Sequence, residues 1–143
     1  YISGHSSGAH LAACALTTEW EKEFGLPSDL IKGALFISGI YDLKAPRLSS
    51  RREYVKFDDE TEETLSPQRH IDRIHTPLIV AYTRLDTPEF QRQSQEFAAA
   101  LKDAGKPVEI VVEERRNHFE FLDELESHGG KLARMALAQM KLA

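Results

Sequence analysis

The sequence predicts an α/β fold built on a parallel sheet. Two observations support this prediction. Short apolar runs of strand length alternate with helical stretches along the chain, an order typical of a layered α/β domain. The run at residues 33–38 is almost continuously apolar, which suits a strand buried on both faces by helices. With 143 residues, the chain is expected to form a single domain, residues 1–143.

The first elements lie on either side of a tight turn. Residues 1–3 are predicted to form the end of a strand, and residues 4–8 are predicted to form a tight turn. A helix is predicted from residue 7 to residue 24. Its first part is rich in small residues, which allow a helix to approach a sheet closely. Gly25 and Pro27 are expected to end it.

The middle of the chain alternates between buried strands and a polar segment. After the strand at residues 33–38, residues 39–42 lead the chain to Asp42. Residues 44–66 are polar and charged, and we expect a solvated surface excursion with one short helix. The next strand covers residues 77–82.

The last third of the chain repeats the alternation. Pro88 suits the first turn of a helix, with Asp86 or Thr87 as its cap. Gly105 is expected to follow the end of this helix. A further strand at residues 108–112 and a terminal amphipathic helix at residues 132–142 complete the prediction.

Composition excludes several functional classes. The formal net charge of −5 argues against nonspecific nucleic-acid binding, which needs a clustered basic surface. No apolar stretch approaches the roughly 20 residues that cross a bilayer. Cys14 is the only cysteine, which excludes an internal disulfide and a cysteine-based zinc site. The single cysteine favours a reducing compartment, and we expect a cytoplasmic protein. No metal or nucleotide motif occurs, so no cofactor is implied.

The sharpest motif is Gly-His-Ser-Ser-Gly at residues 4–8, a G-x-S-x-G pentapeptide. Strand residues precede it and a small-residue helix follows it, which is the setting of a nucleophile elbow. Gly4 and Gly8 are expected to be needed because a side chain at either position would collide with neighbouring backbone. The strained turn would present the Ser6 hydroxyl above the carboxyl edge of the sheet. An ordinary Gly/Ser turn is the alternative.

A serine nucleophile needs a histidine base and an orienting carboxylate. Behind such an elbow the chain order is Ser, then Asp or Glu, then His. Asp86 follows the strand at residues 77–82, and His118 follows the strand at residues 108–112. Because parallel strands end at one edge, these two side chains and Ser6 are expected to converge there. Asp42 is a second candidate for the acid. The other histidines are interpreted as packing or surface residues: His5, His10, His70, His75 and His128.

These segments resemble a known family. Gly-His-Ser-Ser-Gly-Ala-His-Leu-Ala at residues 4–12 is similar to the elbow and following helix of the kynurenine formamidases (arylformamidases) and related α/β-hydrolase esterases. Residues 86–94 resemble the acid-bearing segment of that group, and residues 117–120 resemble its histidine segment. The resemblance implies Ser6 as nucleophile, Asp86 as acid and His118 as base. It also implies a three-layer αβα fold with a mostly parallel sheet.

The resemblance covers only the carboxyl-terminal half of the family fold. The family has an upstream His-Gly-Gly motif that supplies part of the oxyanion hole, and this sequence does not contain it. The backbone amide of Ser7 is then the one oxyanion donor that the chain offers. Losing one such donor typically lowers the rate about 10²–10³-fold. We therefore expect a domain truncated at its N-terminal side, with weak or no activity as an isolated polypeptide.

The resemblance implies hydrolysis of a small acyl substrate through an acyl-enzyme, as in arylformamidases that hydrolyse N-formylkynurenine. The same three residues would serve a general carboxylesterase on small esters. A noncatalytic hydrolase-like module that binds a partner is a third alternative. The expected partner is a small-molecule acyl substrate, with no nucleic acid and no membrane. The oligomeric state is left open, with a homodimer as one candidate.

Overall fold

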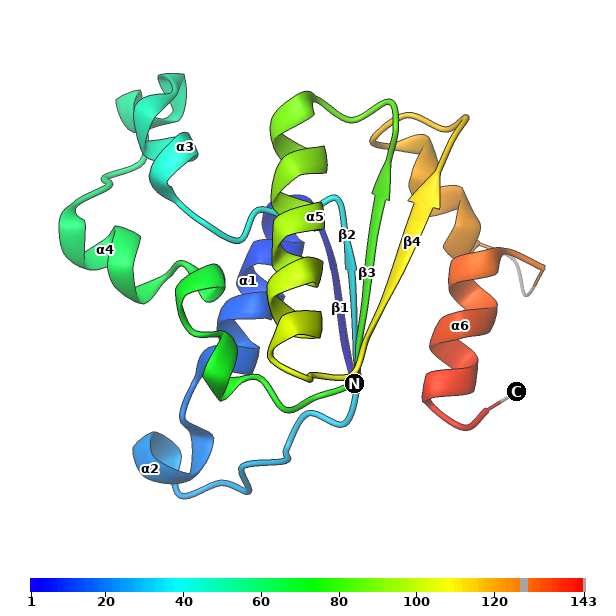
Figure 1. The fold of residues 1–143 in the computed structure, drawn as a ribbon, viewed down its shortest axis with the longest axis horizontal. Coiled ribbons are helices and arrows are strands. Elements are labelled where there is room, and N and C mark those ends of the chain that lie inside the picture. Colours follow the sequence, from blue (N-terminus) through cyan, green and yellow to red (C-terminus); the bar gives the residue numbers. More distant parts are fainter. Residues whose placement is uncertain (127–128, 143) are drawn as a thin grey trace.

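A four-stranded parallel sheet forms the middle layer of the molecule (Figure 1). The computed structural model describes residues 1–126 and 129–142. The strands are β1 (Ile2–His5), β2 (Ala34–Ile37), β3 (Leu78–Thr83) and β4 (Val108–Glu113), and they lie side by side in that order. Every neighbouring pair is parallel, so all four strands end at the same edge of the sheet.

Helices cover both faces of this sheet, which confirms the predicted three-layer arrangement (Figure 1). α1 (Ser7–Thr17) and α5 (Pro88–Asp103) pack on one face, whereas the 3₁₀ segment η4 (Glu120–Leu125) and α6 (Lys131–Gln139) cover the other. Successive residues of β2 alternate between the two apolar cores. Phe36 lies in the core on the α1 and α5 side, while Leu35 and Ile37 lie in the core beneath α6.

The predicted helix at residues 7–24 is two helices. α1 ends at Thr17, and a short α2 (Trp20–Phe24) follows. The hydroxyls of Thr17 and Thr18 both donate to the Cys14 carbonyl, at 3.0 and 3.1 Å. Side chains therefore satisfy a carbonyl in the last turn, and Thr18 adopts an extended conformation that ends the helix. Gly25, with φ 65°, is the C-cap of α2.

Residues 39–42 turn away from β2 and bind α5 rather than a neighbouring strand. Ser38 follows β2 with φ 48°, a left-handed conformation that bends the chain out of the strand direction. The amides of Tyr41 and Asp42 then donate to Oε1 of Gln93 on α5, at 2.6 and 2.8 Å, rather than to a neighbouring strand. Residues 39–41 are nonetheless buried, which explains their apolar character.

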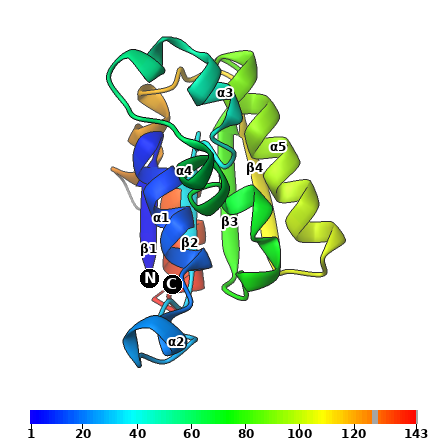
Figure 2. The same cartoon turned by 90° about the vertical axis from the view of Figure 1, so that its left-hand side faces the viewer.

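The segment at residues 44–66 lies on the same side of the sheet as α1 and α5 (Figure 2). It contains more structure than the single predicted helix, namely α3 (Lys44–Leu48), the 3₁₀ turn η1 (Ser50–Glu53) and α4 (Asp59–Thr64). Two further 3₁₀ turns, η2 (Pro67–Arg69) and η3 (Ile71–Arg73), lead into β3. Arg69 holds the segment in place through ion pairs with Asp42, Glu62 and Glu63.

The last third of the chain follows its predicted order. α5 begins at Pro88 and ends before Gly105, whose φ is 68°. Its N-cap is Thr87, which makes no side-chain capping hydrogen bond. α6 ends at Gln139 rather than at residue 142, and Lys141 beyond it has φ 61°. No helix within residues 1–126 and 129–142 is long and apolar enough to cross a membrane.

Candidate active site

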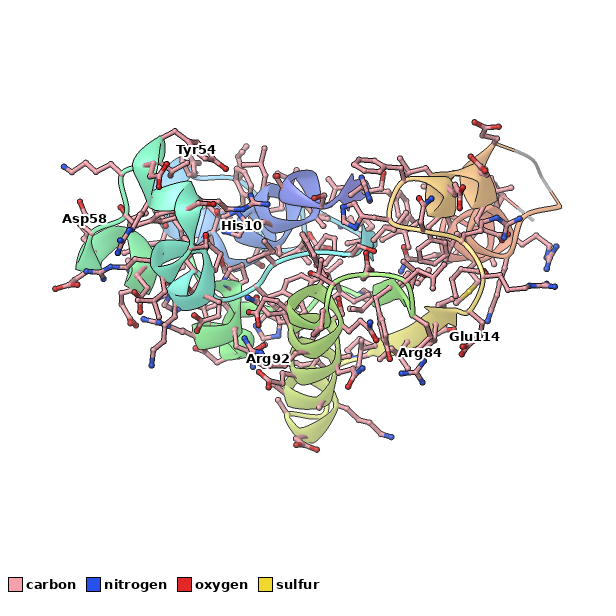
Figure 3. The ribbon with its side chains drawn as sticks, turned by 90° about the horizontal axis from the view of Figure 1, so that it is seen from above. His10, Tyr54, Asp58, Arg84, Arg92 and Glu114 are labelled. Carbon is pink, nitrogen blue, oxygen red and sulfur yellow. The ribbon has the colours of Figure 1, made fainter. Side chains whose placement is uncertain are left out.

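The loops that follow the strands carry the candidate site at the carboxyl edge of the sheet. Ser6 follows β1, Asp86 follows β3 and His118 lies in the loop after β4. Figure 3 looks onto this edge from above, with the segment at residues 44–66 to the left and the ends of β3 and β4, near Arg84 and Glu114, to the right. Parallel pairing of all the strands is what gathers these loops at one edge.

The turn around Ser6 has the strained geometry of a nucleophile elbow. Ser6 adopts φ 55° and ψ −120°, and its amide donates to the Ile37 carbonyl at 2.9 Å. Its side chain forms no capping hydrogen bond, although Ser6 occupies the N-cap position of α1. A non-glycine residue in this conformation is costly and is concentrated at functional sites. The hydroxyl is therefore held at the N-terminus of α1 and is free for chemistry.

The two elbow glycines differ. A Cβ on Gly4 would lie 2.3 Å from the Gly8 carbonyl oxygen and 2.6 Å from the Ala9 amide nitrogen, so only glycine fits there. A Cβ on Gly8 would meet no heavy atom within 4 Å among the residues described. The expectation that both glycines prevent a collision is thus confirmed for Gly4 and wrong for Gly8. The turn brings the backbone of residues 8 and 9 against residue 4, whereas the space beside residue 8 is open.

The Asp86 carboxylate is buried, and its contacts link it to His118, Ser38 and Thr83. Its side chain has no solvent exposure. Oδ1 lies 2.5 Å from Nδ1 of His118. Oδ2 accepts a hydrogen bond from the Ser38 hydroxyl at 2.6 Å and another from the Thr83 amide at 3.0 Å. The carboxylate does not cap α5, so the capping role predicted as an alternative for Asp86 is wrong.

Aromatic rings surround His118, whose side chain is 19% exposed. The Phe90 and His5 rings lie 4.8 and 4.5 Å from its ring centre, and Phe119 packs edge-on at 5.2 Å. Nε2 of His5 donates to the His118 backbone carbonyl at 2.9 Å. Because Nδ1 faces Asp86, Nε2 is the nitrogen left to act on substrate. The Asp86–His118 pair has the geometry of a general base whose imidazole ring is oriented by a carboxylate.

His5 joins the elbow to the loop that carries His118. Burial is the main cause that lowers the pKa of His5 below its ordinary value of 6.5, and the neighbouring His118 lowers it further. His5 is therefore held neutral beside the candidate base. The Thr83 hydroxyl donates to the Arg116 carbonyl and anchors the same loop from β3.

Within the described part of the chain, no hydrogen bond joins the hydroxyl of Ser6, the candidate nucleophile, to His118, the candidate base. Such contacts are often long in the absence of substrate and shorten in the reactive complex. His5, the residue before Ser6, nevertheless packs against the His118 ring, which puts both groups in one small area.

The rival residues have other partners. Asp42 pairs with Nε of Arg69 at 3.3 Å and accepts from the Lys44 amide at 2.7 Å, with no histidine attached. His10 binds the Leu65 carbonyl at 2.8 Å, and His70 binds the Glu63 carbonyl at the same distance. His75 lies beside Lys106. His128 lies outside the described residues.

Further features concern the oxyanion and a metal. Ser7 is the first residue of α1, so its amide has no partner within the helix, and its role as an oxyanion donor stays a prediction. The residues described contain no group of three His, Cys, Asp or Glu side chains that could hold a metal ion.

Sequence reasoning missed Ser38, Thr83 and the anchoring role of His5. The available signal for Ser38 was a lone polar residue at the end of the apolar run that forms β2.

Comparisons with known proteins agree on the fold. The chain is 34% identical to kynurenine formamidase of Danio rerio over 142 residues, which is 96% of this chain and 48% of that protein. It is also 34% identical to kynurenine formamidase of Salmo salar, over 98% of this chain and 49% of that protein. The chain thus spans about half the length of the curated relatives it matches. No family model matches it.

Solved structures agree with the sequence relatives. A bifunctional acetyl ester-xyloside hydrolase of Caldicellulosiruptor lactoaceticus superposes with a TM-score of 0.71 at 20% identity, over 98% of this chain and 56% of that chain. An acylaminoacyl peptidase of Pyrococcus horikoshii gives 0.72 at 25% identity, over 96% and 23%. The chain has the α/β-hydrolase fold. Within this fold, Ser6 follows β1, Asp86 follows β3 and His118 lies in the loop after β4, which is the chain order expected for an elbow serine, its acid and its base.

Proposed function

We propose that the chain carries the nucleophile, acid and base of a serine hydrolase that cleaves the formamide bond of an N-formylated aromatic amine. The observation that supports it most is the 2.5 Å contact between the buried Asp86 carboxylate and His118, at the sheet edge that also carries the strained elbow at Ser6. A buried carboxylate without such a use is costly, because it must leave water.

The reaction proceeds through an acyl-enzyme. The Ser6 Oγ attacks the formyl carbon while Nε2 of His118 takes its proton, and Asp86 stabilises the resulting imidazolium. The Ser7 amide donates to the oxyanion. The intermediate collapses, the C–N bond breaks, and His118 returns the proton to the departing amine. Water then attacks the formyl-serine by the same route and releases formate.

An aromatic leaving group fits the surroundings of the base. Phe119 is 74% exposed and packs edge-on against the His118 ring at 5.2 Å. The leaving group must lie next to His118 to receive its proton, so an aryl ring there can pack against Phe119. The 34% identity to two kynurenine formamidases supports the same substrate class.

A carboxylesterase acting on small esters is the second candidate. It is supported by solved structures of similar fold that are described as esterases, including one from Thermogutta terrifontis with a TM-score of 0.68 at 24% identity. The two candidates share every catalytic residue. They differ in the leaving group, an aromatic amine or an alcohol.

The first test asks whether Ser6 acts as a nucleophile in the full-length protein. A fluorophosphonate probe is expected to label Ser6, as located by peptide mass spectrometry, and labelling is expected to vanish in Ser6→Ala. Ser7→Ala is the matched control, because it retains the backbone amide and the adjacent hydroxyl of Ser6. Absence of labelling in a folded wild-type protein contradicts the enzyme proposal and favours the binding module.

The second test separates the two substrates. Hydrolysis of N-formylkynurenine and of a short-chain acetyl ester is measured side by side in wild type and in Phe119→Ala. The formamidase proposal expects preferential turnover of the formamide and a KM for it that rises about 5–10-fold when the ring is removed. Preference for the ester, with no effect of the substitution, favours the carboxylesterase.

We further propose a cytoplasmic enzyme that acts on a small molecule. The single cysteine supports a reducing compartment. Cell fractionation checks this assignment. A homodimer stays a prediction, which light scattering of the purified protein tests.

A further inference from the structure

We propose that Ser38 is a positioning residue of the hydrolase, whose hydroxyl sets the plane of the Asp86 carboxylate so that Oδ1 faces His118. Ser38 lies immediately after β2, on an element that carries none of the three predicted catalytic residues. The inference deepens the proposed function and depends on it for its catalytic consequence.

The geometry around Asp86 divides its two oxygens between two tasks. Oδ2 accepts from the Ser38 hydroxyl at 2.6 Å and from the Thr83 amide at 3.0 Å, and these two donors come from neighbouring strand ends. Two fixed donors on Oδ2 determine the plane of the carboxylate. Oδ1 is then directed at Nδ1 of His118, 2.5 Å away.

Because the site is buried, the hydrogen bonds from Ser38 and Thr83 to Asp86 cannot easily be replaced. Ser38 and Thr83 are completely buried, and the Asp86 side chain has no exposure. Bulk water is therefore excluded and cannot replace a lost donor, so hydrogen bonds from the protein must compensate the desolvation of the carboxylate. During attack His118 becomes a cation, so a correctly oriented Asp86 is required at that moment.

The backbone conformation at Ser38 is strained for serine and would suit glycine better. Its φ of 48° is left-handed, a conformation that glycine adopts without strain. Its amide donates to the Ala81 carbonyl at 2.7 Å, which ties the residue to the end of β3. Glycine would keep this backbone bond and relieve the strain, but it would lack the hydroxyl that binds Asp86.

Two substitutions separate positioning from folding. Ser38→Gly removes the hydroxyl in a backbone conformation that favours glycine, and Ser38→Ala removes it while keeping a Cβ. Ser94→Ala is the matched control, because Ser94 is also completely buried but its hydroxyl makes no hydrogen bond to Asp86 or His118. Both Ser38 variants are expected to lower kcat about 10–100-fold with little change in KM, whereas Ser94→Ala leaves kcat within about twofold. Wild-type kcat in a folded Ser38→Gly overturns the proposal.

A spectroscopic readout makes the test independent of turnover. The proton on Nδ1 of His118, shared with Asp86, is expected as a strongly downfield ¹H NMR resonance in the wild type. It should disappear in Asp86→Asn, move or broaden in Ser38→Gly, and persist in Ser94→Ala. An unchanged resonance in Ser38→Gly overturns the positioning role. A resonance that responds to Ser38 in a protein that neither turns over substrate nor labels at Ser6 upholds the positioning role and overturns the hydrolase proposal.

Discussion

At the scale of single residues, the site depends on which carboxylate is buried against a histidine. Asp86 and Asp42 both come after predicted strands, and the sequence favoured Asp86 as the acid with Asp42 as the alternative. Asp86 is 6% exposed and binds His118, whereas Asp42 is partly exposed and pairs with Arg69. The Asp42 carboxylate binds Arg69 and the Lys44 amide, and no histidine contacts it among the residues described.

The first prediction compares these two aspartates. Asp86→Asn keeps the shape of the side chain but cannot stabilise the His118 imidazolium, so kcat is expected to fall by about 10⁴-fold. Asp42→Asn retains an oxygen for the Lys44 amide and is expected to change kcat by no more than about threefold. Steady-state kinetics on the preferred substrate measures both. The opposite ranking would reassign the acid to Asp42.

The second prediction concerns Cys14, whose sulfur is half-buried on α1 near the His10 ring and the Leu65 carbonyl. Burial raises the pKa of the Cys14 thiol to about 11. A raised thiol pKa favours the neutral form, so at pH 8 the thiolate fraction is about 0.1%, against about 25% for an ordinary thiol. Iodoacetamide should therefore alkylate the folded protein at least about 100-fold more slowly than the urea-unfolded protein. Equal rates in the two states would show that the thiol is not shielded.

At the scale of elements, the strand–turn–helix unit of β1 and α1 shows how a local pattern specifies a functional shape. β1 pairs with β2 in parallel, and the chain then reverses within a few residues into α1. This reversal brings the Gly8 carbonyl against the Cα of Gly4, and the space that remains admits no side chain at Gly4. The strain at Ser6 is a consequence of that sharp reversal.

The third prediction tests the asymmetry of the two glycines. Gly4→Ala forces a methyl group to 2.3 Å from a backbone oxygen and is expected to destabilise the protein by about 2–4 kcal/mol. Gly8→Ala places a methyl group in open space in the first turn of α1, where alanine favours the helix, so stability is expected to rise by up to about 1 kcal/mol. Urea unfolding followed by circular dichroism gives both values. Similar losses for the two variants would refute the one-sided clash.

At the scale of the whole molecule, the sheet is held between two separate apolar cores. The core on the α1 and α5 side includes Phe36, Tyr41 and Phe97, and the core on the α6 side includes Ile37, Phe121 and Leu132. The second core is covered by η4 and α6, which close the chain over the opposite face (Figure 1). The carboxyl edge keeps its loops in place because both layers hold the strands in register.

The fourth prediction tests the contribution of the α6 layer with two leucines at the end of the chain. Leu132 has no exposure and packs in the core beneath α6, so Leu132→Ala is expected to destabilise the protein by about 2–5 kcal/mol. Leu142 is 71% exposed, and Leu142→Ala should change stability by less than about 0.5 kcal/mol. Chemical denaturation of both variants measures the difference. A loss below about 1 kcal/mol for Leu132→Ala would show that α6 is loosely attached.

Three features were predictable from the sequence: the alternation of strands and helices along the chain, the two-sided burial of β2, and the chain order of Ser6, Asp86 and His118. Each depends on neighbouring residues, namely an apolar run, a Gly-x-Ser-x-Gly turn or a polar residue after a strand. The break at Thr18 was not, because both threonine hydroxyls bind one carbonyl only in a particular rotamer. The irregular path of residues 39–42 also depends on a distant partner, Gln93 on α5.

Local sequence patterns specify which reactive groups the chain possesses and at which strand ends they lie, since periodicity and turn chemistry are local properties. They favoured Asp86 over Asp42 as the acid, but the contact of Asp86 with His118 and the hydrogen bond from Ser38 to its other oxygen, across 48 residues of chain, are visible only in the folded chain. Such contacts follow from the register of parallel strands and the direction of each side chain. No short stretch of sequence contains that information, because it arises only when the strands pack together.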